Sequence, residues 1–347
     1  MNFKFNTFSK KNITSFIELS KIYYPHDQYL CSYNYIYKKY FERPNGKSYI
    51  HEIKINNKVE GRLCYQQDQI VYKNYIIPSL RPIDFLVSEN ARSPFTNTLK
   101  LLNEPKDLLK NYFIINTSNK KSDHLYSQIL KFPKYFDFNT YFFFLNPISV
   151  FKIKKINYFF RQIFFLIFKT LFSIFLFFKP NIKIVETFDN NELTKIFNFK
   201  FKSVAKFNRN NKIFSHRLSM YQKKNLTKLI LKKNNKNIGY MILIKAEYSK
   251  FDISIILDFY VNEQITFTDR IYLIHKLLIT LCKQKTDILL VSGNDKCPIF
   301  TNLIKFPFLK VPDKFLEHKS PFYGRDFNYK IDNLNIFHLS LFDMDWF

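Results

Sequence analysis

An internal repeat is the feature that most restricts how this chain can fold. Four short stretches of the first half recur in the second half, in the same order and at nearly constant spacing. The matching stretches are NNKVEG at 56–61 with NNKNIG at 234–239, IDFLV at 83–87 with LDFYV at 257–261, INTSNKKS at 115–122 with VSGNDKCP at 291–298, and KFP at 131–133 and 305–307. We therefore predict two copies of one fold, in domains at 1–150 and 181–347, joined by a segment at 151–180.

Each copy has the same expected order of elements. A helical region precedes two β-rich runs that flank an asparagine-rich turn, which predicts a hairpin. An apolar strand with a central aspartate follows (Asp84 or Asp258), and then a helix, a second apolar strand, a short helix and a final strand. This order predicts an α/β (α+β) chain of two tandem domains, each a mixed, mostly antiparallel sheet flanked by helices.

Composition argues against several classes of protein. The formal net charge is +26, but lysine, asparagine, isoleucine, phenylalanine and tyrosine dominate the whole chain and glycine occurs only 5 times. This bias in composition also affects the apolar residues, so it indicates a preference for certain codons rather than selection for a basic patch. Nucleic acid is therefore not the expected main partner. The four cysteines stand apart and no histidine pair has zinc-ligand spacing, so we expect no metal site and a reducing, cytoplasmic compartment. The N-terminal residues also lack the apolar core of a signal peptide.

The segment between the copies is strongly apolar. Residues 156–178 approach the length of a membrane span, but Arg161 and Lys169 interrupt them. On a helix, Gln162, Lys169 and Ser173 share a narrow polar stripe opposite aromatic and aliphatic residues. Three interpretations stay open: a helix lying in a membrane surface, a buried helix between the domains, and a true span. The first predicts peripheral contact with the inner face of the membrane.

Motifs of the first copy resemble the GNAT superfamily of acyl-CoA transferases. Arg92 follows Val87 at the spacing of the superfamily's motif after its cofactor strand. The next motif of the superfamily is matched in spacing by Asn119, Ser122, Leu125 and Tyr126. The run YIYKKYFERPNGKS at 35–48 and the closing IFHLSLFDMDWF are similar to segments of transferases encoded with surface-polysaccharide genes. The two-copy arrangement is also similar to Fem-type aminoacyltransferases.

The resemblance implies a binding site for acetyl-CoA or another acyl-CoA beyond the strand that ends at Val87. The positions it assigns to this cosubstrate are Val87, Arg92, Ser93, Phe95, Thr96 and Asn119. Glycines in the superfamily let backbone N–H groups approach the pyrophosphate, but Ser93, Phe95 and Asn97 stand at these positions here. Pro94 also lacks an N–H group. Side-chain donors of the loop are the expected substitutes, although each hydroxyl alone equally suits a helix N-cap.

Acyl transfer from a thioester needs a base for the acceptor and an acid for the departing thiolate. The resemblance assigns the acid to Tyr126. The candidate bases are Asp84, Glu89 and Glu60, with His51 and His124 as further alternatives. In the second copy Thr266 stands in place of the arginine, so its loop is expected to be structural and Asp258 to serve the fold.

Three functions remain open from the sequence. The first is transfer of an acyl group from acyl-CoA to an amine or hydroxyl, such as an amino sugar that is free or linked to a lipid carrier. The second is Fem-type transfer that depends on aminoacyl-tRNA. The third is a membrane-associated scaffold that has lost cofactor binding, which the missing glycines favour.

Overall fold

The computed structural model describes most of both halves of the chain. The described residues are 1–44, 46–73, 75–103, 105–145, 182–197, 204–221, 226–248, 251–261, 266–269, 272–273, 276–277, 281, 286–304, 308–313, 320–325 and 336–344. The connecting segment 151–180, with the apolar stretch 156–178, lies outside them. Within the described ranges, no helix is long and apolar enough to cross a membrane.

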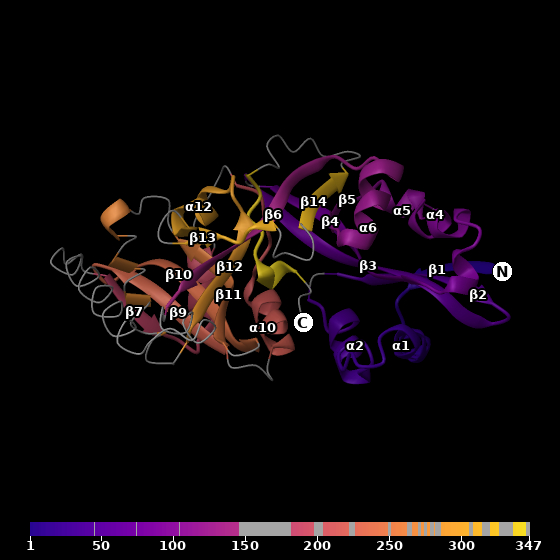
Figure 1. The fold of residues 1–347 in the computed structure, drawn as a ribbon, viewed down its shortest axis with the longest axis horizontal. Coiled ribbons are helices and arrows are strands. Elements are labelled where there is room, and N and C mark those ends of the chain that lie inside the picture. Colours follow the sequence, from indigo (N-terminus) through magenta and orange to yellow (C-terminus); the bar gives the residue numbers. More distant parts are fainter. Residues whose placement is uncertain are drawn as a thin grey trace, which may run out of the picture.

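The first half follows the predicted order, with one additional strand at its start. Its elements are β1 (Asn2–Thr7), α1 (Lys10–Tyr23), α2 (Tyr33–Tyr40), β2 (Ser48–Ile55), β3 (Lys58–Tyr72), β4 (Tyr75–Val87), α3 (Glu89–Arg92), α4 (Thr96–Asn103), α5 (Lys106–Leu109), β5 (Phe113–Thr117), α6 (Lys120–His124), the π-helical turn η1 (Leu125–Ile129) and β6 (Lys134–Phe144). Helices α1 and α2 cover one face of the sheet, and α4, α5 and α6 lie on the other (Figure 1).

The second half repeats this arrangement. Its elements are β7 (Ile182–Glu186), α9 (Asn190–Phe197), β8 (Lys206–Phe207), α10 (Asn211–Met220), β9 (Leu226–Lys233), β10 (Lys236–Tyr248), β11 (Phe251–Val261), β12 (Ile288–Asn294), α12 (Pro298–Ile304), β13 (Leu309–Lys310), β14 (Ser320–Arg325) and the 3₁₀ turn η5 (Leu341–Asp343). Strands β7, β9, β10, β11 and β12 succeed one another in the sheet as β1 to β5 do. The predicted fold class is thereby confirmed.

The repeated asparagines form the predicted hairpin turns. Asn56 and Asn57 have φ values of +49° and +63°, and Asn234 and Asn235 have +50° and +62°. Positive φ at both central residues gives a turn whose twist matches that of the flanking strands, and asparagine adopts this conformation more readily than most residues. Both hairpins, β2–β3 and β9–β10, are therefore explained by the same local sequence.

The two halves share one continuous sheet because each contributes a strand to the other. The order is β1-β2-β3-β4-β5-β14-β6-β12-β11-β10-β9-β7, with β13 beside β6 and β8 beside β3. Strand β14 of the second half lies between β5 and β6 of the first, where Phe322 is paired with both Thr117 and Phe136. On its other edge β6 pairs with β12, for example through Thr140 and Ser292. The largest apolar core accordingly contains residues of both halves.

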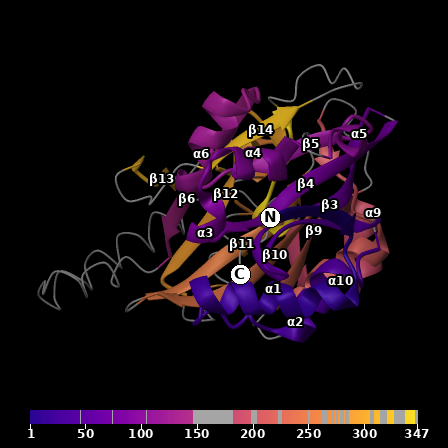
Figure 2. The ribbon, with the colours of Figure 1, turned by 90° about the vertical axis from the view of Figure 1, so that its right-hand side faces the viewer.

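Helices of the two halves also meet below the sheet. Helix α10 lies beside α2, on the same side of the sheet as α1 (Figure 2). The ring of His216 on α10 contacts the carbonyl oxygen of Lys38 on α2, with Nε2 at 3.0 Å. This junction places residues from both halves around one point close to β3 and β4.

Candidate active site

Strands β4 and β5 separate in the middle of the first half's sheet. They pair in parallel at only two residue pairs, the second of which joins Leu80 to Ile114. Beyond it β4 continues along β3 to Val87, whereas β5 pairs with β14. The edge of β4 that faces β5 from Arg81 onwards has no strand partner among the described residues. Such an edge can bind an extended ligand through backbone hydrogen bonds.

Asp84 lies at an irregular point of β4, just beyond the separation. The register of β4 against β3 shifts there, and Asp84 has a φ of +51°, as expected for a β-bulge. Its carboxylate points toward α2, where Oδ2 lies 3.0 Å from Lys39 Nζ and accepts a hydrogen bond from the Tyr40 hydroxyl. Burial, followed by the charge of Asp84, raises the pKa of Tyr40, so this phenol stays a donor. The bulge therefore holds a carboxylate next to the point where the strands separate.

The segment after Val87 forms a closed helical turn. Ser88 caps α3 by accepting a hydrogen bond from the N–H of Ala91 at 3.2 Å. The Arg92 guanidinium folds back and donates to the carbonyl oxygen of Val87 at 3.1 Å, and Asn97 Nδ2 donates to the carbonyl oxygen of Ala91 at 3.1 Å. Several polar groups near the strand end are thus engaged within the segment itself. The N-cap of α3 is Ser88, a residue that the sequence motifs did not identify.

The positions assigned to the cosubstrate differ in exposure. Val87 is buried against Ile53, Ala91 and Leu101. The exposed positions around the end of β4 are Arg92, Ser93, Phe95 and Thr96. Asn119 lies at the start of α6, where its Oδ1 accepts from the backbone N–H of Ser122 at 2.9 Å. The local role of Asn119 is therefore to cap a helix, although its side chain is exposed, and of the assigned set Val87 alone is buried.

Tyr126 lies within a compact cluster beside the strand separation. It is 4% exposed and packs with Leu80 and Ile114, the last pair between β4 and β5. Its ring centroid is 5.7 Å from that of Phe132 and 6.4 Å from that of Tyr323 on β14. Burial raises the pKa of Tyr126 above its usual range, so the phenol remains protonated, as an acid must.

The structure places Tyr126 and Asp84 on opposite faces of the sheet. Asp84 faces α2, whereas Tyr126 packs with Leu102 of α4, and Figure 2 shows these helices on opposite sides. A single substrate would contact both residues only by passing through the separation between β4 and β5. The two residues therefore do not form a side-chain pair.

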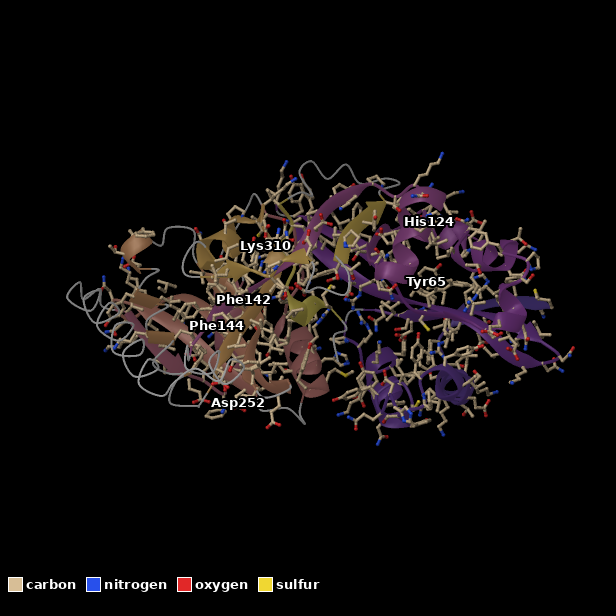
Figure 3. All side chains as sticks on the ribbon, in the orientation of Figure 1. Tyr65, His124, Phe142, Phe144, Asp252 and Lys310 are labelled. Carbon is tan, nitrogen blue, oxygen red and sulfur yellow. The ribbon has the colours of Figure 1, made fainter. Side chains whose placement is uncertain are left out.

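The other candidate acids and bases have separate surroundings. His51 is buried, and its Nδ1 lies 2.8 Å from the carbonyl oxygen of Leu101. Glu60 is nearly buried, and His124 is exposed on α6 (Figure 3). Glu89 is exposed in the first turn of α3. Of these carboxylates and imidazoles, Asp84 is the one that the bulge positions at the separated strands.

Asp258, the counterpart of Asp84, belongs to a buried ion-pair network. Arg209 donates to both Asp258 and Asp343, and the Tyr240 hydroxyl donates to Asp258 at 2.6 Å. Arg209 also donates to Ser340 Oγ at 3.0 Å. The bonding partners of Asp258 are the side chains of Arg209 and Tyr240, an arrangement that agrees with the structural role predicted for it. The network joins β11 to η5 near the end of the described chain.

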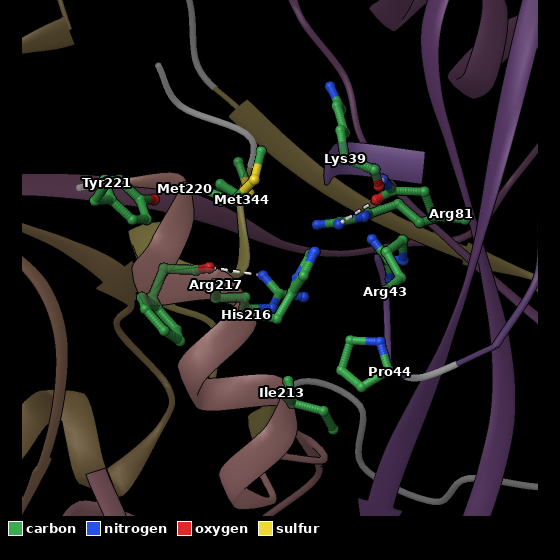
Figure 4. A pocket seen from close by; sticks show the side chains of 12 residues that line it. Lys39, Arg43, Pro44, Arg81, Ile213, His216, Arg217, Met220, Tyr221 and Met344 are labelled. Atoms are coloured by element: carbon green, nitrogen blue, oxygen red, sulfur yellow. Dashed lines mark hydrogen bonds between the residues drawn. The ribbon is translucent and has the colours of Figure 1, made fainter. Parts of the chain in front are cut away.

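A basic pocket at the junction of the halves was not predicted from the sequence. Lys39, Arg43 and Arg81 of the first half and Arg217 of the second line a cavity of about 30 Å³ (Figure 4). Asp68 lies behind them, with Oδ1 2.7 Å from Arg43 Nη2. Lys39 and Arg43 both occur in the stretch 35–48 that resembles polysaccharide transferases, but the contribution of Arg217 depends on the packing of α10 against α2. Because lysine and arginine are so frequent in this chain, a single basic residue does not by itself indicate a binding site.

Comparison with solved structures identifies the fold. A GCN5-related N-acetyltransferase from Anabaena variabilis aligns with a TM-score of 0.61 and 11% identity, over 94% of this chain and 73% of that one. A probable N-acyltransferase of unknown function from Enterococcus faecalis aligns with a TM-score of 0.61 and 9% identity, over the same shares. N-myristoyltransferase from Saccharomyces cerevisiae, with bound myristoyl-CoA, aligns with a TM-score of 0.52 and 10% identity, over 99% of this chain and 83% of that one.

These similarities establish the fold of GNAT-like N-acyltransferases for the chain. No protein-family model matches the sequence, and no curated protein matches it. The fold expected from the sequence motifs is therefore confirmed by structure, while the chemistry rests on the site itself.

Proposed function

We propose that the protein transfers an acyl group from an acyl-CoA to an amine or hydroxyl of an acceptor. The observation that carries this proposal is the separation of β4 from β5 next to the bulge at Asp84. The pantetheine arm of CoA is extended and contains amide groups, which suits the edge of β4 beyond Leu80. The fold shared with N-acyltransferases, one of them with bound myristoyl-CoA, supports the same assignment.

The residues around the separation have distinct roles in this proposal. Arg92 and the exposed hydroxyls of Ser93 and Thr96 bind the phosphates of CoA from the end of β4, for which the Arg92 guanidinium must release the carbonyl oxygen of Val87. Asp84 accepts the proton of the acceptor's amine or hydroxyl. The acceptor forms a bond to the acyl carbon and the C–S bond of the thioester breaks. Tyr126, protonated on the opposite side of the separation, gives its proton to the departing thiolate.

We propose a cytoplasmic location and an acceptor that is a small molecule or a lipid-linked sugar. The sequence similarity of 35–48 to polysaccharide transferases supports an amino sugar. Peripheral contact with the inner face of the membrane through 156–178 would bring the site near a lipid-linked acceptor.

Calorimetry with acetyl-CoA and a longer acyl-CoA tests the donor. We expect binding that weakens about tenfold or more in Arg92→Ala, because a charge-assisted hydrogen bond to phosphate is lost. Lys21→Ala is the matched control, since Lys21 is an exposed cation on α1 and is not among the positions assigned to the cosubstrate. No heat and no thermal shift with either thioester would remove the proposal. If steeply salt-dependent binding of tRNA appeared instead, transfer from aminoacyl-tRNA would replace it.

One observation favours a non-catalytic scaffold as the second candidate. Several polar groups of the segment from Ser88 to Asn97 are bonded within the segment, as in a structural turn. A scaffold of this kind predicts that Tyr126→Phe and Asp84→Asn proteins support the same cell-surface phenotype as the wild type. A loss of that phenotype in folded variants argues for catalysis.

A further inference from the structure

We propose that the basic pocket binds an oxyanion, a carboxylate or phosphate, carried by the acceptor. The use of this pocket by an acceptor rests on the proposed acyl transfer, whereas its affinity for an oxyanion does not. Its lining includes residues of α2 and α10 (Figure 4), two helices that lie on the same side of the sheet (Figure 2). Its lining residues are Lys39, Arg43, Pro44, Gln66, Arg81, Ile213, His216, Arg217, Met220, Tyr221, Phe342 and Met344.

The wall of the pocket has the charge and donor geometry of an oxyanion site. It contains three arginines and Lys39, whose ammonium points away from the arginines (Figure 4) and pairs with Asp84, and no carboxylate stands among the described residues that line it. Guanidinium groups present planar pairs of N–H donors that match the oxygens of carboxylate and phosphate. His216 adds no charge near neutral pH, because burial and the nearby Arg43 and Arg217 lower its pKa.

The cationic side chains are held in place by the fold. Arg81 Nη2 donates to Gln66 Oε1 at 2.8 Å, and Arg217 Nη1 donates to the carbonyl oxygen of Phe342 at 2.6 Å. Asp68 Oδ1 lies 2.7 Å from Arg43 and 3.7 Å from Arg217, so one buried carboxylate positions arginines from both halves. Such a preorganised set binds an anion with little loss of side-chain entropy.

The dimensions and neighbours of the pocket define the ligand class. A cavity of about 30 Å³ is larger than the roughly 10–15 Å³ needed to hold one water but far too small for a whole cofactor, so we expect one small group to enter it. Met220, Phe342 and Met344 form an apolar side, so the group next to the oxyanion is expected to be partly apolar. Lys39 lines the pocket and pairs with Asp84, which directs the rest of a bound acceptor toward the bulge.

The first experiment measures binding of inorganic phosphate and of acetate by calorimetry at constant ionic strength, without acyl-CoA. The variants are Arg217→Gln and Arg43→Gln, which remove charge but keep an amide donor. Lys212→Gln is the matched control, because Lys212 is exposed on the same helix α10 as Arg217. We expect about a tenfold or greater increase in Kd in both arginine variants and no change in the control. Thermal midpoints establish that each variant is folded.

The outcomes separate the oxyanion site from the proposed acyl transfer. Binding of phosphate alone assigns a phosphate ester to the acceptor, and binding of acetate alone assigns a carboxylate; either result supports the site. Binding of neither probe, or equal binding in the three variants and the wild type, overturns it. If phosphate binds at the pocket but acyl-CoA does not bind the protein, the oxyanion site stands and acyl transfer is the proposal that fails.

The second experiment links the site to the acceptor. The substrates are one amino sugar with and without a phosphate ester, and one amino acid with its carboxylate free or converted to an amide. We expect Arg217→Gln to raise KM for the charged member of a pair by about tenfold while leaving kcat and the uncharged member unchanged. Equal effects on both members would show that Arg217 supports only the structure.

Discussion

The ammonium group of Lys39 lies 3.0 Å from the carboxylate of Asp84, and the same lysine lines the basic pocket between the two halves. One side chain therefore joins the bulge beside the separated strands to the place where both halves meet. Because Lys39 comes from α2 and Asp84 from β4, the pair also positions α2 over the bulge. The candidate base and the candidate anion site are thus parts of one region on the lower face of the sheet.

Asp84→Asn tests the carboxylate as a base. Asparagine adopts positive φ readily and still accepts hydrogen bonds, so we expect the bulge and the fold to persist. Loss of the base should reduce kcat by about 10²–10⁴, with acyl-CoA affinity unchanged. Steady-state kinetics with the acceptor and calorimetry with acyl-CoA provide the two readouts. An unchanged kcat in a folded variant would assign Asp84 to structure alone.

The buried network around Arg209 gives a contrasting prediction for the second half. Arg209→Met leaves the carboxylates of Asp258 and Asp343 buried without their cation, and all three side chains are 1% exposed or less. We expect a loss of about 3–5 kcal/mol in the free energy of unfolding, measured by urea denaturation. Lys195→Met, a change in a basic residue of the last turn of α9, is the comparison, and it should lie within about 0.5 kcal/mol of the wild type. A small effect of Arg209→Met would show that the network does not stabilise the second half.

The structure follows from the sequence where its cause is local. The hairpin at Asn56 and the strand that ends at Val87 follow from turn chemistry and apolar runs of a few residues. The left-handed conformation of Asp84 had no signal in the sequence, because it depends on how β4 pairs with β3. The same limit applies to the site. The motif spacing located Arg92 and Tyr126, but it could not show that Ser88 closes the segment by capping α3.

Contacts between distant parts of the chain could not be predicted from the sequence, and the reason is different. The insertion of β14 between β5 and β6 brings Phe322 beside Thr117. The meeting of Arg217 with Arg43 around Asp68 likewise requires both halves to be folded. Neither relationship leaves a pattern at fixed spacing, and the abundance of lysine and phenylalanine hides individual basic or aromatic positions. The presence of two copies was therefore predictable, whereas the pairing of strands from one copy with strands of the other was not.

Lys206 provides a pH-dependent test of the second half. Burial and the nearby Arg209 lower the pKa of Lys206 to about 8 in the folded protein, below the roughly 10.4 of an unperturbed lysine. Between pH 8 and about 10.4 the unfolded chain therefore binds more protons at Lys206 than the folded protein does. The contribution of Lys206 to the free energy of unfolding consequently increases as the pH rises through this range. From pH 7.5 to pH 9 the gain should be about 1 kcal/mol in the free energy of unfolding.

Lys206→Met isolates this contribution from other titrating groups. The buried Cys64 has its pKa raised to about 12, so its effect on stability has the opposite sign and begins near pH 9. Urea denaturation at pH 7.5 and pH 9 should show the gain in the wild type and its absence in the variant. Equal pH dependence in both proteins would mean that Lys206 remains protonated in the folded state throughout this range.

The repeat itself offers a matched pair of glycines. Gly61 on β3 and Gly239 on β10 occupy the same place after the asparagine turns. A Cβ at Gly239 would meet the backbone carbonyl oxygen of Tyr260, which cannot move without disturbing the pairing of β10 with β11. At Gly61 the nearest atom is Cδ1 at the end of the buried Ile53 side chain, at 3.0 Å, rather than a backbone atom.

We therefore expect alanine to destabilise the protein much more at Gly239 than at the equivalent Gly61. Gly239→Ala should lower the free energy of unfolding by about 3 kcal/mol or more, at the upper end of the cost of overpacking. Gly61→Ala should cost less than about 1 kcal/mol, because rotation of the Ile53 side chain relieves the contact while alanine reduces the entropy of the unfolded chain. Urea denaturation of both variants measures the difference. Equal losses would indicate that the close approach of β11 to β10 is not specific to the second copy.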